Sequence, residues 1–166
     1  MKSQKILLII SLTLLFVELS FADKLLQPHN LNFEYGVKDQ IPEGWYMPLK
    51  FHQKGYKAII NNKEAISGKK SLMILNEQEN EQTDYCNVFQ SFDAGDYQNK
   101  IVKFKIALKT DFKNDTSLCK IWIATDLKDG SKGNTYLLDS LNTNNEWKYF
   151  ELSGKIENDA DIINIG

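Results

Sequence analysis

The sequence predicts a single all-β domain of the β-sandwich or jelly-roll class. Three observations lead to this prediction: apolar and polar residues alternate over many short segments, turn-forming residues separate these segments, and after the first 22 residues no apolar pattern has helical spacing. The chain has 166 residues, of which 42% are hydrophobic and 25% charged. That length allows about one domain, and this apolar fraction excludes a disordered or fibrous chain.

Residues 1–22 predict a secretory signal peptide. Two lysines within the first five residues are followed by an apolar run over 6–17, and Ser20 and Ala22 are the small residues expected before a cleavage site. The alternative, a membrane anchor, is disfavoured because the run is shorter than the ~20 residues that cross a bilayer. We therefore expect export to the periplasm or the extracellular space, a mature module of residues 23–166, and no membrane span.

The predicted strands follow from alternation with a period of two. The clearest is 100–110, where Val102, Phe104, Ile106 and Leu108 share one face and lysines dominate the other. The other candidates are bounded by turn signals rich in Asn, Asp and Gly, as expected for a sandwich. They are 31–35, 56–60, 71–75, 85–92, 118–125, 135–139, 147–153 and 161–165.

The last predicted strand, 161–165, is followed only by Gly166. Natural sheets usually protect an exposed edge, and no turn or polar tail follows this strand. We therefore expect the sequence to stop inside its sandwich, before the last strands. The alternative is a domain that ends on an edge strand.

Composition and motifs exclude several classes of function. All 20 basic residues are lysine and the net charge is −2, so a nucleic-acid partner is not expected. The sequence has no GxSxG or HExxH motif, and His29 and His52 are best interpreted as loop histidines. We expect no catalytic site within these residues, and an independent hydrolase is the weakest hypothesis.

Aromatic residues are the candidate ligand-binding groups. Trp122 lies opposite the apolar face of its predicted strand, and Trp45 and Tyr46 follow a Pro-Glu-Gly turn that could present them at the rim of a cleft. Exposed rings of this kind suit the apolar face of a sugar, whereas the alternative for each is a core ring that buries about 150–250 Å². Trp147 is a weaker candidate, because the side of its strand is ambiguous.

The two cysteines, Cys86 and Cys119, allow one disulfide in an exported protein. The alternative is a pair of small buried hydrophobes, because each cysteine shares a face with apolar neighbours. Sequence alone leaves both open, since a bridge needs Cα atoms within about 7 Å. A zinc site is disfavoured, because there is no CxxC motif or histidine companion.

An ordered series of short motifs extends over nearly all of the mature chain. They are LNFE at 31–34, IPEGW at 41–45, AISGKKSL at 65–72, VFQSF at 88–92, KFKIALKT at 103–110, KIWI at 120–123, WKYFEL at 147–152 and INIG at 163–166. In order and spacing they resemble the carbohydrate-binding-module-like jelly rolls with the galactose-binding fold. The resemblance is strongest to the module that precedes the catalytic domain in secreted C-terminal-processing-type serine peptidases and erythromycin-esterase-like hydrolases.

This resemblance implies a non-catalytic accessory module of a larger hydrolase, with a polysaccharide or glycan and its own downstream catalytic domain as partners. The alternative is a module that positions the enzyme and binds no sugar. The resemblance also implies a possible structural calcium, for which Glu34 matches one ligand of the family. Calcium takes 6 to 8 oxygen ligands and could join the first strand to the last. The alternative for Glu34 is a solvated carboxylate that binds no metal.

Overall fold

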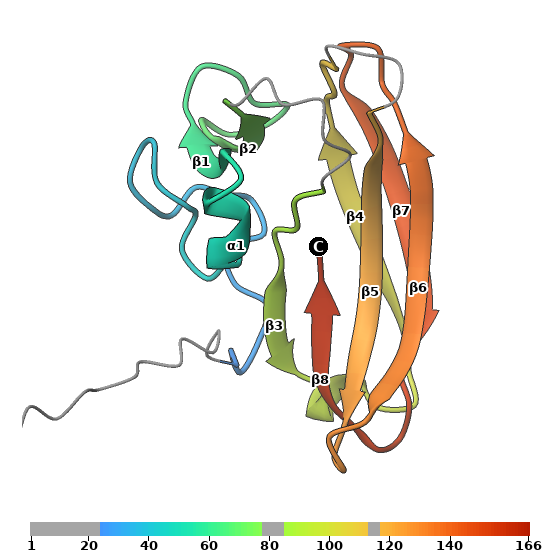
Figure 1. Ribbon diagram of the computed structural model, residues 1–166. Coiled ribbons are helices and arrows are strands. Elements are labelled where there is room, and N and C mark those ends of the chain that lie inside the picture. Colours follow the sequence, from blue (N-terminus) through green and yellow to red (C-terminus); the bar gives the residue numbers. More distant parts are fainter. Residues whose placement is uncertain (1–23, 78–84, 113–116) are drawn as a thin grey trace, which may run out of the picture.

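The computed structural model describes residues 24–77, 85–112 and 117–166, so the predicted signal peptide lies outside the described residues. Within them the chain is almost entirely β (Figure 1). In chain order the elements are α1 (Leu49–His52), β1 (Tyr56–Asn61), β2 (Ser71–Asn76), β3 (Gln90–Asp93), a 3₁₀ turn (Gly95–Tyr97), β4 (Ile101–Leu108), β5 (Cys119–Leu127), β6 (Lys132–Leu141), β7 (Lys148–Lys155) and β8 (Ala160–Ile165).

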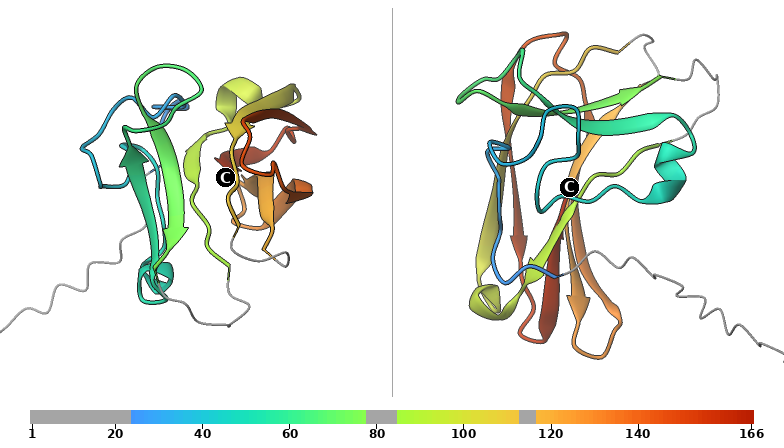
Figure 2. Two further views of the ribbon diagram at one scale, coloured as in Figure 1. Left: turned by 90° about the horizontal axis from the view of Figure 1, so that it is seen from above. Right: turned by 90° about the vertical axis from the view of Figure 1, so that its left-hand side faces the viewer.

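The strands form a jelly-roll β-sandwich, which confirms the predicted fold class. Four strands pair in the order β3-β8-β5-β6, β4 pairs with β7, and β1 pairs with β2, all antiparallel. Figure 1 shows the four-stranded sheet in front with β4 and β7 behind its β5-β6 part. The β1-β2 hairpin and α1 lie beside β3, on the side away from β6, in both Figure 1 and Figure 2.

The four-stranded sheet buries one face because core and outward side chains alternate along its strands. On β5, Ile121 and Ile123 are almost fully buried, whereas Trp122 between them is half-buried on the opposite face. On β8, Ile163 and Ile165 enter the same core. Burial of each such side chain stabilises the fold by roughly 1.5–3 kcal/mol. The sheet therefore has a core face and an outward face, and the outward one carries Trp122.

The β4-β7 pair packs against the four-stranded sheet as the second layer. Val102 and Phe104 of β4 are partly buried and pack against the core, as their alternation predicted. On β7, Gly154 lies under the ring of Tyr136 of β6, and a Cβ at Gly154 would overlap that ring. The Tyr136 hydroxyl donates a hydrogen bond of 2.9 Å to the carbonyl of Lys155. One aromatic side chain thus joins the two layers.

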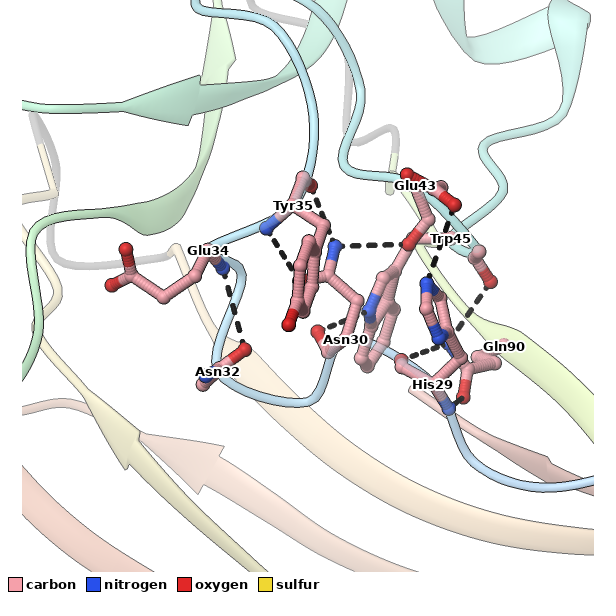
Figure 3. A network of polar contacts seen from close by, with 9 residues as sticks. His29, Asn30, Asn32, Glu34, Tyr35, Glu43, Trp45 and Gln90 are labelled. Carbon is pink, nitrogen blue, oxygen red and sulfur yellow. Dashed lines mark hydrogen bonds and ion pairs between the residues drawn. The ribbon is translucent and has the colours of Figure 1, made fainter.

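The prediction of a strand at 31–35 is wrong, because this segment is a loop. The buried Asn30 side chain holds the loop: its amide donates to the carbonyls of Tyr35 and Glu43, at 2.7 and 3.0 Å, and its oxygen accepts from Tyr35 N–H at 2.9 Å (Figure 3). These hydrogen bonds satisfy backbone groups that would otherwise pair with a neighbouring strand. Phe33, with φ of 59°, turns its ring onto Trp45.

The segment predicted as a strand over 85–92 contributes only its last residues to the sheet, since β3 covers Gln90–Asp93. Residue 89 is nevertheless bridged to Tyr46, with backbone hydrogen bonds of 2.8 and 2.9 Å in the two directions. This bridge fixes the 45–47 segment beside the sheet. In the described residues, no helix has the length and apolar character needed to cross a membrane.

Candidate functional site

A cavity of about 550 Å³ lies on the outward face of the four-stranded sheet. Every strand of that sheet contributes to it, together with the segment at Tyr46 and the first described residue, Lys24. The side chains that define it include Lys24, Tyr46, Asn87, Phe89, Ser91, Trp122, Ala124, Asp126, Lys132, Thr135, Ile162 and Asn164. Because they alternate with core residues along their strands, the same pattern that builds the core also builds this cavity.

Three aromatic rings form a row at one end of the cavity, which we call the aromatic row: Tyr46, Phe89 and Trp122. The Tyr46 and Phe89 rings meet edge to face with centroids 5.3 Å apart, and Phe89 and Trp122 are tilted with centroids 6.1 Å apart. The Trp122 indole N–H donates to Asn87 Oδ1 at 3.2 Å, which fixes the orientation of its ring. All three rings are half-buried, so each keeps some surface open to a ligand.

Four polar side chains form a second row, the polar row: Ser91, Asn164, Asp126 and Lys132. Ser91 Oγ donates to Asn164 Oδ1 at 2.6 Å, and the Asn164 amide donates to Asp126 Oδ2 at 3.1 Å. Lys132 Nζ then donates to Asp126 Oδ1 at 2.6 Å. The members come from β3, β8, β5 and β6 in that order, so the row crosses the whole sheet.

The two rows lie on the same face at different heights along the strands. Ser91 follows Phe89 by two residues and Asp126 follows Trp122 by four, and β3 and β5 run in the same direction because both are antiparallel to β8. At ~3.3 Å per residue, the rows are about 7–13 Å apart. A ligand that lies across the strands can therefore touch rings on one side and hydrogen-bonding groups on the other.

The charged side chains that line the cavity are paired within the protein. Lys24 Nζ lies 2.9 Å from Asp93 Oδ2 and 2.9 Å from Asp161 Oδ1. The hydrogen bond from Lys24 holds the pKa of Asp93 below its usual value, which favours the ionised carboxylate. Lys132 and Asp126 form the other pair. A ligand thus meets charges that already have partners of opposite sign.

Two of the three predicted ligand-binding residues, Tyr46 and Trp122, lie in this cavity, and the third does not. Trp45 is only 8% exposed, packs at 5.2 Å from Phe33, and donates its indole N–H to the Asn30 carbonyl at 3.2 Å. Its core interpretation is therefore correct, and the prediction of a ring at the rim is wrong. The turn before Trp45 brings the chain inward instead of projecting it into solvent.

Sequence reasoning missed Phe89 and the polar row. Phe89 alternates with Val88 and Gln90, which are buried, so the period of two could have placed it on the outward face. The polar row had no comparable signal, because the pairing of β8 between β3 and β5 brings its members together. Trp147, the weaker candidate, is half-buried and does not line the cavity.

Cys86 and Cys119 are free thiols, so the disulfide that an exported protein allows is not present in this structure. The Cys86 thiol lies 3.3 Å from Met47 Sδ, and burial raises its pKa to about 11. Burial also raises the pKa of Cys119. Both groups therefore have the character of small, partly buried hydrophobes, the alternative that the sequence left open.

The two histidines do not join the cavity. His52 is exposed at the end of α1. His29 stacks on Tyr35 with centroids 5.8 Å apart, and its Nε2 lies 3.4 Å from Glu43 Oε1. The buried amide of Gln90 holds the backbone of His29 through both its N–H and its carbonyl, at 2.8 and 2.7 Å (Figure 3). These contacts position a loop beside β3.

No family model matches the sequence, and no curated protein matches it. Among solved structures, the chain is similar to the C-terminal family 22 carbohydrate-binding module of Clostridium thermocellum Xyn10B, with a TM-score of 0.50 and 13% identity over 79% of this chain and 80% of that one. It is also similar to the CBM22-1 xylan-binding domain of Paenibacillus barcinonensis Xyn10C, with a TM-score of 0.50 and 14% identity over 76% of each chain. At these identities the likeness shows the fold alone, a jelly-roll sandwich of the kind found in carbohydrate-binding modules.

Proposed function

We propose that the chain is an exported, non-catalytic module that binds a polysaccharide or glycan on the outward face of its four-stranded sheet. The observation that carries this proposal is the parallel arrangement of the aromatic row and the polar row in one cavity. Export rests on the signal-peptide pattern of residues 1–22.

The chemistry of a sugar matches the two rows. One side of a pyranose ring is lined by C–H groups and packs well on an aromatic face, whereas its hydroxyls both donate and accept hydrogen bonds. The aromatic row offers three rings for the first kind of contact. Serine, asparagine and aspartate in the polar row offer donors and acceptors for the second.

The charge distribution favours an uncharged stretch of polysaccharide. Lys24 is already bound by two carboxylates, and Lys132 is bound by Asp126. A polyanion would have to compete with these internal partners, and a neutral glycan would not. Surface charges of this kind contribute little to the affinity for an uncharged ligand.

The resemblance of the motif series to modules that precede peptidase and esterase domains suggests the role of this binding. We propose that the module holds a linked hydrolase near its glycan-rich surroundings. The similarity of the fold to carbohydrate-binding modules supports this accessory role.

The proposal is tested by affinity electrophoresis through gels that contain neutral polysaccharides, such as xylan, glucomannan and mixed-linkage glucan. We expect at least one polysaccharide to retard the wild-type chain and Trp122→Ala to abolish the retardation. Tyr149→Ala is the matched control, because Tyr149 is 74% exposed on β7, outside the cavity. Melting temperatures of all three proteins distinguish lost binding from lost folding.

Two results would contradict the proposal. If no polysaccharide or glycan retards the folded wild-type chain, the module positions its enzyme without binding sugar. If Trp122→Ala and Tyr149→Ala are retarded as much as wild type, binding occurs on another face.

A further inference from the structure

The loop over residues 30–37 is tied to the start of β2 by one lysine side chain. The Lys70 ammonium donates to the carbonyl oxygen of Glu34 at 2.8 Å and to that of Gly36 at 3.2 Å. The two carbonyls are separated by one residue and converge on the same nitrogen. Lys70 is half-buried, so its charge is partly removed from solvent at this position.

The Glu34 carboxylate completes the connection from the other direction. Its Oε1 accepts hydrogen bonds from the backbone N–H groups of Lys69 and Lys70, at 2.7 and 3.1 Å. The bond from Lys69 holds the pKa of Glu34 below its usual value. Gly68 permits this approach, because its φ is +70° and a Cβ there would overlap Oε1. In Figure 3 the carboxylate points away from Asn30 and Trp45.

The residues around Glu34 do not fit a calcium ion. Calcium needs 6 to 8 oxygen ligands, whereas here the two loop carbonyls contact an ammonium and Oε1 faces N–H groups. In the part of the chain that the structure describes, no three His, Cys, Asp or Glu side chains are grouped to hold a metal. The positive charge of Lys70 also lies where a divalent cation would have to approach.

We propose that Lys70 is the resident cation of this loop and replaces a divalent metal in holding it to the sheet. Carbonyl oxygens are ligands that a hard divalent cation prefers. Here the Lys70 ammonium takes the place of such a cation beside the two loop carbonyls. The loop is consequently closed without calcium. This inference does not depend on sugar binding, because neither Lys70 nor Glu34 lines the cavity.

The experiment uses Lys70→Met, which keeps the length of the side chain and removes its charge. Lys69→Met is the matched control: Lys69 is exposed and donates to Glu34 through its backbone N–H, which the substitution retains, whereas its charge has the smallest of the effects on the pKa of Glu34. Melting temperatures of both variants and wild type are measured in EDTA and in millimolar calcium chloride. Hydrogen exchange of a peptide covering residues 30–37 reports on the loop itself.

We expect the wild-type melting temperature to be the same in EDTA and in calcium. Lys70→Met should lower it by about 3–10 °C and accelerate exchange in the 30–37 peptide, whereas Lys69→Met should do neither. A wild-type chain that melts lower in EDTA, or higher in calcium, would overturn the proposal and restore a metal site. Lys70→Met exchanging in this peptide like Lys69→Met would also overturn it. If Lys70→Met does not fold, the wild-type comparison in EDTA and in calcium still tests whether a metal holds the loop.

Discussion

Trp122 on β5 and Gly166 after β8 exchange both of their backbone hydrogen bonds, at 2.9 Å from Trp122 N and 3.1 Å from Gly166 N. A Cβ at Gly166 would lie 2.9 Å from two carbons of the indole and 2.6 Å from the Val88 carbonyl oxygen. The ring that we assign to sugar binding therefore rests directly on a residue without a side chain. Its position depends on that space.

Gly166→Ala should weaken polysaccharide binding by about 2- to 10-fold, because the added methyl group displaces the Trp122 indole from its preferred position. Affinity electrophoresis measures the change. Gly130→Ala is the control: it introduces strain at φ of +83° in the β5-β6 turn, but nothing lies within 4 Å of the new Cβ. Equal binding by both variants would show that the indole tolerates the methyl group.

Asn164→Ala should lower the free energy of unfolding by about 1–3 kcal/mol. Asn164 is only 9% exposed and links Ser91 to Asp126, so its loss leaves two polar groups without their partner. Urea unfolding measures the difference. Asn158→Ala, at an exposed position in the β7-β8 loop, should change stability by less than about 0.5 kcal/mol. Similar values for both variants would contradict a structural role for the polar row.

Binding of the polysaccharide should change by less than about twofold between ~50 mM and ~500 mM sodium chloride. The reason is that Lys24 and Lys132 are paired with carboxylates of the protein and not with the ligand. Titration calorimetry at both salt concentrations is the measurement. A steep loss of affinity with salt, together with binding to polygalacturonate or heparin, would show that the site takes a polyanion.

Stability should be constant from pH 7 to about pH 5 and fall in more acid solution. Hydrogen bonds from Lys24 and from the Lys69 N–H lower the pKa of Asp93 and of Glu34 below 3.8 and 4.5. Groups with a lowered folded-state pKa stabilise the protein above the unfolded-state pKa, and this contribution is lost as pH falls through the folded-state value. The raised pKa of Lys24 stabilises the folded state fully below pH 10.5, and this contribution is lost only at higher pH, outside this range.

Melting temperatures between pH 2.5 and pH 7 measure this dependence. Asp93→Asn and Glu34→Gln should melt below wild type at pH 7, and the difference should narrow as pH falls through the lowered folded-state pKa values and the wild-type carboxylates become protonated. A melting temperature that stays constant or rises as pH falls would contradict the assignment of these two groups.

Reducing agent should not change the melting temperature, and the denatured chain should release two titratable thiols. Both expectations follow from the free Cys86 and Cys119. In the folded protein, Cys86 should react slowly with thiol reagents, because a pKa of about 11 leaves little thiolate at neutral pH. Zero titratable thiols, with a melting temperature that falls in dithiothreitol, would establish a bridge.

The strands of the sandwich could be predicted because the alternation of apolar and polar residues can be seen within each short segment of the sequence. The predicted strands at 56–60, 71–75 and 100–110 correspond to β1, β2 and β4. The turn that joins β5 to β6 contains Asp129 and Gly130, as the predicted turn signals rich in Asn, Asp and Gly require, and Gly130 has a positive φ. The segment at 31–35 failed because the Asn30 side chain supplies the hydrogen bonds that a neighbouring strand would have supplied.

The cavity was only partly predictable, for a different physical reason. Trp122 and Tyr46 could be proposed as ligand-binding residues from their immediate neighbours in the sequence, and the same reasoning could have found Phe89. The burial of Trp45 depends on where Phe33 and Asn30 lie, and the polar row depends on the order of strands in the sheet. Such relationships arise from tertiary pairing, on which short-range patterns carry no information.

Each strand of the four-stranded sheet supplies one member of the polar row. The hydrogen-bonded pair Ser91 and Asn164 is separated by 73 positions in the chain. A polypeptide with any one of these strands misplaced has an interrupted row. Retention on a glycan column would therefore sort correctly assembled molecules from misfolded ones in a single step.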